Sequence, residues 1–261
     1  MTRLFGCTCN EPHRVAQALE PVRSSLVAQG PISRWGLGYV QSGEVLLRRH
    51  PRATDRVDFY ESVSALQSDY VIGFASPEDG LTGNINTQPF RFRHWLFAGE
   101  GEMDSFEDEV QPRLLEHIPH FLARNISGKT SAEHVFHLFL AQLYEAGCLD
   151  DPNVALADVR RALRDTLALL YSLMSEADLS RGPGNLVVTN SRAMFALRLD
   201  HPILVRGFKH PERRRSDHRH FRAVLAMSTS DEPGEGFEEI PPNSVLTISR
   251  ELKTEIHNLG T

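Results

Sequence analysis

The chain opens on Met1-Thr2-Arg3-Leu4-Phe5-Gly6-Cys7-Thr8-Cys9, and the turn-forming residues 10–12 follow this stretch. We predict a strand over residues 2–9 and, after the turn, a helix over residues 12–29 that ends at Gly30-Pro31. Alternate residues of a strand point to one face. Cys7 and Cys9 are therefore interpreted as two small buried side chains and not as metal ligands.

Strands and helices occur in blocks along the rest of the chain. Gln41-Ser42-Gly43 is a hairpin signal between strands predicted at 35–40 and 44–49. Further strands are predicted at 69–75, 94–98, 185–190, 193–199, 221–228 and 244–248. Helices are predicted at 105–124 with interruptions near Pro112 and Pro119, from Thr130-Ser131 onward, and at 154–177. This order of strands, helices and strands indicates an α+β protein with two packed sheets and helices outside them. We expect a single domain over residues 1–261.

The helix that begins at Thr130-Ser131 carries a start signal. Thr130 and Glu133 have the spacing of a capping box, in which two side chains bind backbone N–H groups of the first turn. Apolar residues follow at helical spacing. We therefore interpret Glu133 as a capping residue and not as a catalytic acid.

Composition restricts the class of protein. The chain has 261 residues, 41% of them hydrophobic, with a formal net charge of -6 and three cysteines. The negative charge argues against bulk binding to nucleic acid. No apolar run is long enough for a membrane helix and no signal-peptide pattern is present, so we expect no membrane insertion. Few cysteines, odd in number, are typical of a reducing compartment, which predicts a cytoplasmic protein.

A series of short motifs extends along most of the chain. The motifs are Met1-Thr2-Arg3-Leu4-Phe5-Gly6, Trp35-Gly36-Leu37-Gly38-Tyr39, Asn86-Thr87-Gln88-Pro89-Phe90, Phe97-Ala98-Gly99-Glu100-Gly101, Gly128-Lys129-Thr130-Ser131-Ala132-Glu133, and finally Ala226-Met227-Ser228 with Ile240-Pro241-Pro242. In order and spacing they resemble the motifs of class II glutamine amidotransferases, in particular short stand-alone members. The resemblance implies a four-layer αββα sandwich of the N-terminal-nucleophile (Ntn) hydrolase type.

The resemblance also assigns catalytic positions. In the family, M-C-R-L-L-G supplies a cysteine that becomes the N-terminal nucleophile, with its own α-amine as general base. Thr2 occupies that position here. The asparagine of F-A-H-N-G donates to the oxyanion, and its place is taken by Glu100. Gly101, a backbone donor to the same oxyanion, is retained.

The substrate pocket departs from the family in the same way. An H-V-R-x-A-T strand supplies an arginine that binds the substrate carboxylate, and the matching position in residues 71–76 is Gly73. The aspartate of G-x-T-D-S-E, which accepts from the substrate ammonium, is replaced by Ser131. The resemblance places three more residues in the pocket: Arg3, Ser76 and Asn86.

These departures decide the expected function. Loss of one oxyanion donor costs about 10²–10³ in rate, and Glu100 adds a negative charge where one must develop. We therefore predict a catalytically degenerate protein that acts as a binding or regulatory module, with no cofactor and no metal.

The alternative is an active Ntn amidohydrolase that uses Thr2 on an amide other than glutamine. A register slip that brings Arg91 or Arg93 into the pocket in place of Gly73 is a second alternative.

Glu100 itself needs a compensating environment. An isolated buried carboxylate is costly and takes up a proton instead. We expect Glu100 to lie at a pocket mouth with solvent or to pair with a cation such as Arg3.

Residues 209–222 form a basic island in an otherwise acidic chain. Clustered arginines bind phosphate and carboxylate groups, so the island is a candidate site for an anion or a partner, the alternative being a solvated loop. The candidate residues are Arg213, Arg214, Arg215 and Arg219. His218 and His220 share a face if a strand begins there, but they lack further ligands for a metal. The expected partners are another protein, a second copy of the chain or a small anionic ligand, with no nucleic acid and no membrane.

Overall fold

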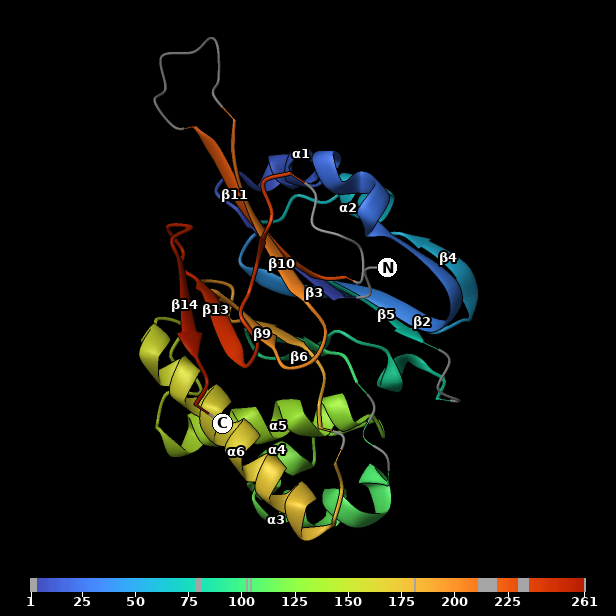
Figure 1. Ribbon diagram of the computed structural model, residues 1–261, viewed down its shortest axis with the longest axis vertical. Coiled ribbons are helices and arrows are strands. Elements are labelled where there is room, and N and C mark those ends of the chain that lie inside the picture. The colour runs from blue at the N-terminus through green and yellow to red at the C-terminus, as the bar shows by residue number, and fades with distance from the viewer. Residues whose placement is uncertain are drawn as a thin grey trace.

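The computed structural model describes residues 4–77, 81–101, 103, 105–180, 182–210, 220–229 and 235–260. Figure 1 shows four layers: a helical layer, two sheets, and a second helical layer. The predicted αββα architecture is therefore confirmed. Every strand pair in both sheets is antiparallel.

The first sheet is eight-stranded, in the order β12-β10-β11-β1-β5-β2-β3, with β4 paired to β2. Its strands are β1 (Leu4–Cys9), β2 (Val27–Gln41), β3 (Glu44–His50), β4 (Thr54–Asp58), β5 (Tyr70–Pro77), β10 (Ile203–His210), β11 (Phe221–Ser228) and β12 (Glu238–Glu239). The N-terminal strand β1 is central and pairs with β5 on one side and β11 on the other. Positions near the chain start therefore lie beside residues about 70 and 225 positions away.

The second sheet is six-stranded, in the order β14-β13-β9-β8-β7-β6. Its strands are β6 (Phe90–Phe92), β7 (Trp95–Gly99), β8 (Leu186–Thr189), β9 (Met194–Arg198), β13 (Ser244–Ile248) and β14 (Thr254–Asn258). β14 forms one edge of this sheet and β6 the other.

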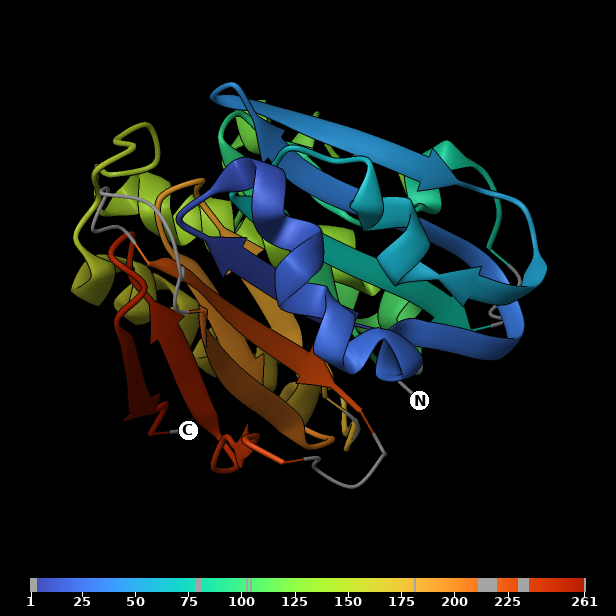
Figure 2. The same cartoon turned by 90° about the horizontal axis from the view of Figure 1, so that it is seen from above.

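Helices cover the outer face of each sheet. The first sheet is covered by η1 (Pro12–Arg14), α1 (Val15–Leu19), η2 (Glu20–Leu26) and α2 (Phe59–Ser64), and the view from above shows the blue N-terminal helices lying over its strands (Figure 2). The second sheet is covered by η4 (Phe106–Val110), α3 (Gln111–Glu116), α4 (His120–Ala123), α5 (Ser131–Glu145) and α6 (Leu156–Glu176). A short turn, η3 (Asn84–Asn86), precedes β6.

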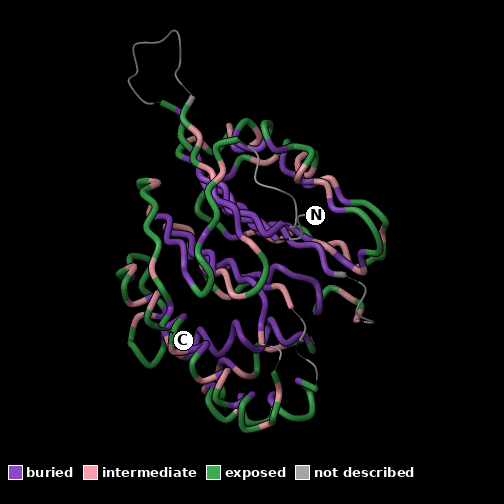
Figure 3. The backbone as a smooth tube through the Cα atoms, viewed as in Figure 1, coloured by how far each residue is buried: buried purple, intermediate pink, exposed green. Residues whose placement is uncertain are grey.

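Three hydrophobic clusters separate the four layers, and the buried backbone in Figure 3 follows the two sheets. One cluster joins the first sheet to α1 and α2 and contains Phe5, Phe59 and Leu225. A second lies between the sheets and contains Leu4, Phe74 and Met194. The third joins the second sheet to α5 and α6. The strands β5, β10 and β11 therefore alternate their side chains between two different cores.

The predicted helix over 12–29 was wrong at its C-terminal end. The helical segment ends at Leu26, and β2 runs from Val27 through Gly30-Pro31. A bulge between Gln29 and Ile32, opposite β4, accommodates Gly30, which has a φ of +90°. β4 pairs with Gln29 and with Ile32 on the two sides of the bulge, so Gly30 and Pro31 mark a strand irregularity and not a helix end.

Other predicted elements agree with the structure. Ser42 and Gly43 both have positive φ and form the β2–β3 turn. Pro119 precedes α4 as predicted, and the predicted interruption near Pro112 is also present, because η4 ends at Val110 and α3 begins at Gln111 with Pro112 in its first turn. The strands β4, β6, β10, β12 and β14 and the helix α2 were not predicted. β10 was missed because Arg206-Gly207 breaks its apolar pattern, although it pairs with β11 over its whole length.

Candidate functional site

The end of the first sheet at Leu4 is where the family resemblance places the reaction. Leu4 pairs with Phe74 of β5 and with Ser228 of β11. Thr2 and Arg3 precede Leu4 and lie outside the described residues, so their roles stay predictions. The residues around this sheet end are described, and they form two polar clusters.

Glu100 belongs to the first cluster. Ser228 Oγ donates to Glu100 Oε2 at 2.6 Å, and Asn185 Nδ2 donates to Ser228 Oγ at 3.1 Å. Burial raises the pKa of Glu100 to about 7, against the lowering effects of Ser228, His201 and Asn185. The residue as a whole is half-buried, but its carboxyl group is shielded from water, and a pKa of about 7 means that charged and neutral forms coexist at neutral pH. It is held by neutral groups; the expected pairing with Arg3 lies outside the described residues.

Asn185 was not identified as a site residue from the sequence. Its side chain connects the groups of this cluster by hydrogen bonds. Its side chain is fully buried and its Nδ2 also donates to the His201 carbonyl at 2.9 Å. Its Oδ1 accepts from the backbone N–H groups of Leu199 and Asp200 at 2.9 and 3.1 Å. An asparagine at the first position of a predicted strand was the available signal, but its side-chain partners lie at residues 199–201 and at Ser228.

The backbone conformation and close contacts at position 101 require glycine. It has a φ of +83°, and a Cβ at this position would lie 2.5 Å from the backbone nitrogen of Gly184. Gly184 N donates to the Glu100 carbonyl, and Glu100 N donates to the Asn185 carbonyl. These bonds fix the Glu100-Gly101 backbone against the start of β8.

Gln88 holds the same segment from the other side. Its Nε2 donates to the Gly99 carbonyl at 2.9 Å, and its Oε1 accepts from Gly99 N at 2.7 Å. Gln88 stands where the N-T-H-P-F motif has histidine, and both functional ends of its amide are used structurally. It connects the Glu100 cluster to the loop that carries Asn86.

Asn86 lies in the second cluster, together with a buried arginine that the sequence interpretation did not identify. Arg34 Nε donates to the Asn86 carbonyl at 2.6 Å, and Arg34 Nη1 donates to the Leu81 carbonyl at 2.8 Å. The Asn86 side chain donates to the Thr82 carbonyl and accepts from Lys129 N, each at 2.8 Å. Ser76 is buried and pairs with Arg34 across β5 and β2. Asn86 thus braces the loop onto the start of α5.

Ser131 occupies the first turn of α5. It is buried, and its Oγ has no hydrogen-bond partner among the described residues. Thr130 Oγ1 accepts from Glu133 N at 3.3 Å, while the Glu133 carboxylate accepts from Ser127 N and Gly128 N. Burial raises the pKa of Glu133, whereas these amides and Arg49 lower it. The Thr130 half of the predicted capping box is confirmed, whereas the Glu133 carboxylate binds the preceding loop and not the N–H of Thr130.

Thr130→Ala is expected to lower the free energy of unfolding by about 1 kcal/mol, because the cap of α5 is lost. Chemical denaturation measures this difference. Thr254→Ala, at an exposed threonine of β14, is the control and should change stability by less than about 0.5 kcal/mol. Equal effects of the two substitutions would contradict the capping role.

Gly73 lies in the centre of β5, opposite Phe5 of β1 and Leu37 of β2. A Cβ on Gly73 would lie 2.0 Å from Cε1 of Phe5. Phe5 is fully buried and packs edge-to-face on Phe59 of α2, with ring centroids 5.2 Å apart. The position that the resemblance assigns to a substrate-binding arginine therefore faces a filled hydrophobic core.

The two arginines considered as substitutes for Gly73 are engaged elsewhere. Arg91 Nη1 donates to the Val45 carbonyl at 2.7 Å. Arg93 forms an ion pair with Asp150 and lies over the ring of Phe92. β5 pairs with β1 and β2 without a register shift at Gly73.

A cleft of about 470 Å³ lies beside the second cluster. It is lined by Pro31, Ile32, Ser33, Pro51, Ala53, Thr54, Asp55, Leu81 and Thr82. Its walls are apolar and hydroxyl-bearing, with Asp55 as the carboxylate. The cleft depends on the unpredicted bulge of β2 and on β4, which explains why no sequence pattern indicated it.

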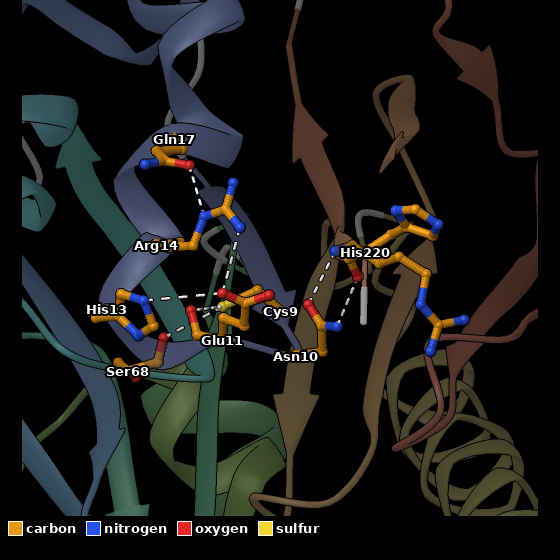
Figure 4. A network of polar contacts seen from close by, with 9 residues as sticks. Cys9, Asn10, Glu11, His13, Arg14, Gln17, Ser68 and His220 are labelled. Carbon is orange, nitrogen blue, oxygen red and sulfur yellow. Dashed lines mark hydrogen bonds and ion pairs between the residues drawn. The ribbon is translucent and has the colours of Figure 1, made fainter. Parts of the chain in front are cut away.

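The basic island is described only at its two ends, and Figure 4 shows how one of them is anchored. Asn10 Nδ2 donates to the His220 carbonyl at 3.0 Å, and Asn10 Oδ1 accepts from Arg222 N at 2.8 Å. The Arg14 guanidinium lies over the ring of Phe221. The candidate anion-binding residues Arg213, Arg214, Arg215 and Arg219 lie outside the described residues, as does His218, so this prediction stays open.

Cys7 and Cys9 are buried, which confirms their interpretation as core residues. Cys9 Sγ contacts the Ser68 carbonyl at 3.5 Å (Figure 4). Burial raises the pKa of both thiols, that of Cys9 to about 12.

Among the described residues no group of three or more His, Cys, Asp or Glu side chains is arranged to hold a metal ion. In the same part of the chain, no helix is long and apolar enough to cross a membrane.

Comparison with solved structures identifies similar folds. A glutamine aminotransferase class-II domain protein from Silicibacter pomeroyi superposes with a TM-score of 0.58 at 17% identity, over 98% of each chain. A predicted glutamine amidotransferase from Pseudomonas aeruginosa gives 0.59 at 13% identity, over 97% of this chain and 98% of that one. Glutamine phosphoribosylpyrophosphate amidotransferase from B. subtilis gives 0.54 at 14% identity, and the 98% of this chain that aligns spans 49% of that enzyme. No protein-family model and no curated protein matches the sequence. The fold is thus the Ntn-hydrolase fold of class II glutamine amidotransferase domains.

Proposed function

We propose that this protein, which has the fold of a class II glutamine amidotransferase domain, does not hydrolyse glutamine and acts as a binding or regulatory module. The contact between Phe5 and Gly73 carries the proposal. Phe5 fills the space into which a side chain at position 73 would project. A bidentate arginine for the substrate carboxylate has no room there while Phe5 stays in place.

Glu100 supports the same conclusion from the oxyanion side. Above pH 7 its carboxylate is mostly charged, because its pKa is about 7. A negative charge next to a developing oxyanion raises the barrier instead of lowering it. At lower pH the carboxyl group is neutral and this repulsion is removed.

Ser131 supports the same conclusion at the position where the resemblance places the substrate ammonium group. A serine hydroxyl carries no charge, so it does not provide the ionic partner that an aspartate supplies. A neutral hydroxyl is also a weaker acceptor for a cation than a carboxylate is. With Gly73, the two charged contacts to the amino-acid end of glutamine are both replaced.

The cleft beside Arg34 supports a binding role. Its volume of about 470 Å³ falls in the range of small-molecule sites, about 300–1,000 Å³. Hydroxyl groups of Ser33, Thr54 and Thr82 line it together with the carboxylate of Asp55. A protein partner or a second copy of the chain is part of the same proposal for the regulatory role.

The test is release of ammonia from glutamine by the purified protein, at about pH 5.5 and about pH 8, on either side of the pKa of Glu100. We expect no release above that of a Thr2→Ala variant at either pH. Release that Thr2→Ala abolishes would contradict the proposal. N-terminal sequencing of the same sample shows whether Thr2 carries the free α-amine that catalysis requires.

A further inference from the structure

A second cleft, of about 260 Å³, lies at the opposite end of the molecule, between α6 and the edge strand β14. These two elements lie side by side at the lower left of Figure 1. The cleft is lined by Ala157, Arg160, Arg161, Arg164, Val245, His257, Asn258 and Leu259. The lining contains three arginines and a histidine but no carboxylate.

The helical repeat brings the arginines together. Arg160 and Arg164 are one turn apart on α6, and Arg161 is adjacent to Arg160. The opposite face of α6 is buried through Val159 and Leu163. The side chain of Arg160 is 21% exposed, compared with 61% for Arg161 and 51% for Arg164. Arg160 therefore forms the inner part of the cleft and the other two its rim.

Arg160 has an unused hydrogen-bond donor. Its Nη1 is buried and has no hydrogen-bond partner among the described residues. The carboxylate oxygen of Glu255 is 3.9 Å from this nitrogen, which is too far for a hydrogen bond. A buried donor without an acceptor is destabilising, because it has lost its hydrogen bond to water without replacement. An acceptor oxygen brought by a ligand would recover this free energy.

The carboxylates around the cleft form ion pairs at exposed positions. Asp158 pairs with Arg161 at 3.3 Å, and Asp165 pairs with Arg164 at 3.2 Å. Glu255 also lies 3.2 Å from His257. Exposed pairs of this kind are screened by water and contribute little to stability, so they compete weakly with a doubly charged anion.

We propose that this cleft binds a small phosphate monoester. Guanidinium groups match the oxygens of phosphate in a bidentate manner, and a phosphate group offers three acceptors and up to two charges to Arg160, Arg161 and Arg164. Ala157, Val245 and Leu259 provide an apolar wall for a short organic group. The site is separate from the residues of the proposed degenerate pocket and does not depend on that proposal.

Isothermal titration calorimetry at low ionic strength, with inorganic phosphate, glycerol 3-phosphate and citrate as probes, tests the proposal. Glycerol 3-phosphate is expected to bind most tightly. Arg160→Gln should weaken its binding by at least about tenfold. The matched control is Arg113→Gln, which removes the same charge from the same helical layer at a half-exposed position outside the cleft and should change affinity by less than about twofold. Thermal midpoints without ligand verify that both variants fold.

Two further variants separate this cleft from other sources of positive charge. Glu255→Gln should tighten binding a few-fold, because it removes the carboxylate that competes for Arg160. Replacement of Arg213, Arg214 and Arg215 by glutamine should leave binding unchanged. The proposal is overturned if no probe binds, if Arg160→Gln and Arg113→Gln behave alike, or if the triple replacement abolishes binding. Equal affinity for inorganic phosphate and glycerol 3-phosphate would overturn the assignment to a monoester.

Discussion

Gly73→Ala is expected to lower the free energy of unfolding by about 3 kcal/mol, and Gly73→Arg by more, enough to prevent accumulation of folded protein. The reason is steric. The added Cβ would lie 2.0 Å from a ring carbon of Phe5, which is itself fixed against Phe59. Arginine also brings a charge into the core between the first sheet and α1 and α2. Thermal and denaturant unfolding measure both effects.

A double-mutant cycle with Phe5→Leu tests whether Phe5 is the cause. Leucine is the residue that the M-C-R-L-L-G motif has at this position, and it removes the ring from the space above Gly73. Gly73→Ala should cost at least about 1 kcal/mol less in the Phe5→Leu background than in the native chain. Gly207→Ala is the matched control, because Gly207 lies in the same sheet with no atom within 4 Å of an added Cβ. If the losses in unfolding free energy of the two substitutions are additive, Phe5 does not restrict the space for a side chain at position 73.

Glu100→Gln is expected to stabilise the protein above pH 7, by up to about 3 kcal/mol. The folded-state pKa of Glu100 is about 7, raised from an ordinary 4.5, so the folded state binds the proton more tightly than the unfolded state. The native chain therefore loses stability as pH rises from about 4.5 to about 7, at up to about 1.4 kcal/mol per unit. A neutral amide removes this dependence and still accepts from Ser228. Near pH 5 the two proteins should differ little.

Thermal midpoints at several pH values test this prediction. A difference of about 3 kcal/mol corresponds to roughly 6–12 °C in a protein of this size. Glu145→Gln removes the same charge from an exposed position on α5, so its difference from the native chain should not vary with pH in the same way. If Glu100→Gln instead destabilises the protein at pH 8, the carboxylate is paired with a cation, Arg3 being the first candidate.

The sequence by itself determined the architecture, because its signals are local. Ser42-Gly43 specifies a turn through backbone conformations that few residue pairs adopt, and Thr130 starts α5 by accepting from an N–H three residues later. The order of strand and helix blocks then leaves two packed sheets with helices outside. The motif positions also gave the expectation of a pocket at the N-terminal end of β1. None of these inferences required a partner from a distant segment.

Only the tertiary structure decided what those residues do. Glu100 meets Ser228 across 128 positions of sequence, and the burial there raises its pKa. Phe5 closes the space above Gly73 only because β1 and β5 pair in that register. Gly30-Pro31, interpreted locally as a helix end, lies inside a strand because β4 pairs with the residues on both sides of it. Hydrogen bonding, burial and steric exclusion at these positions depend on neighbours that sequence spacing does not specify, so the fold was predictable from the chain and the chemistry of the site was not.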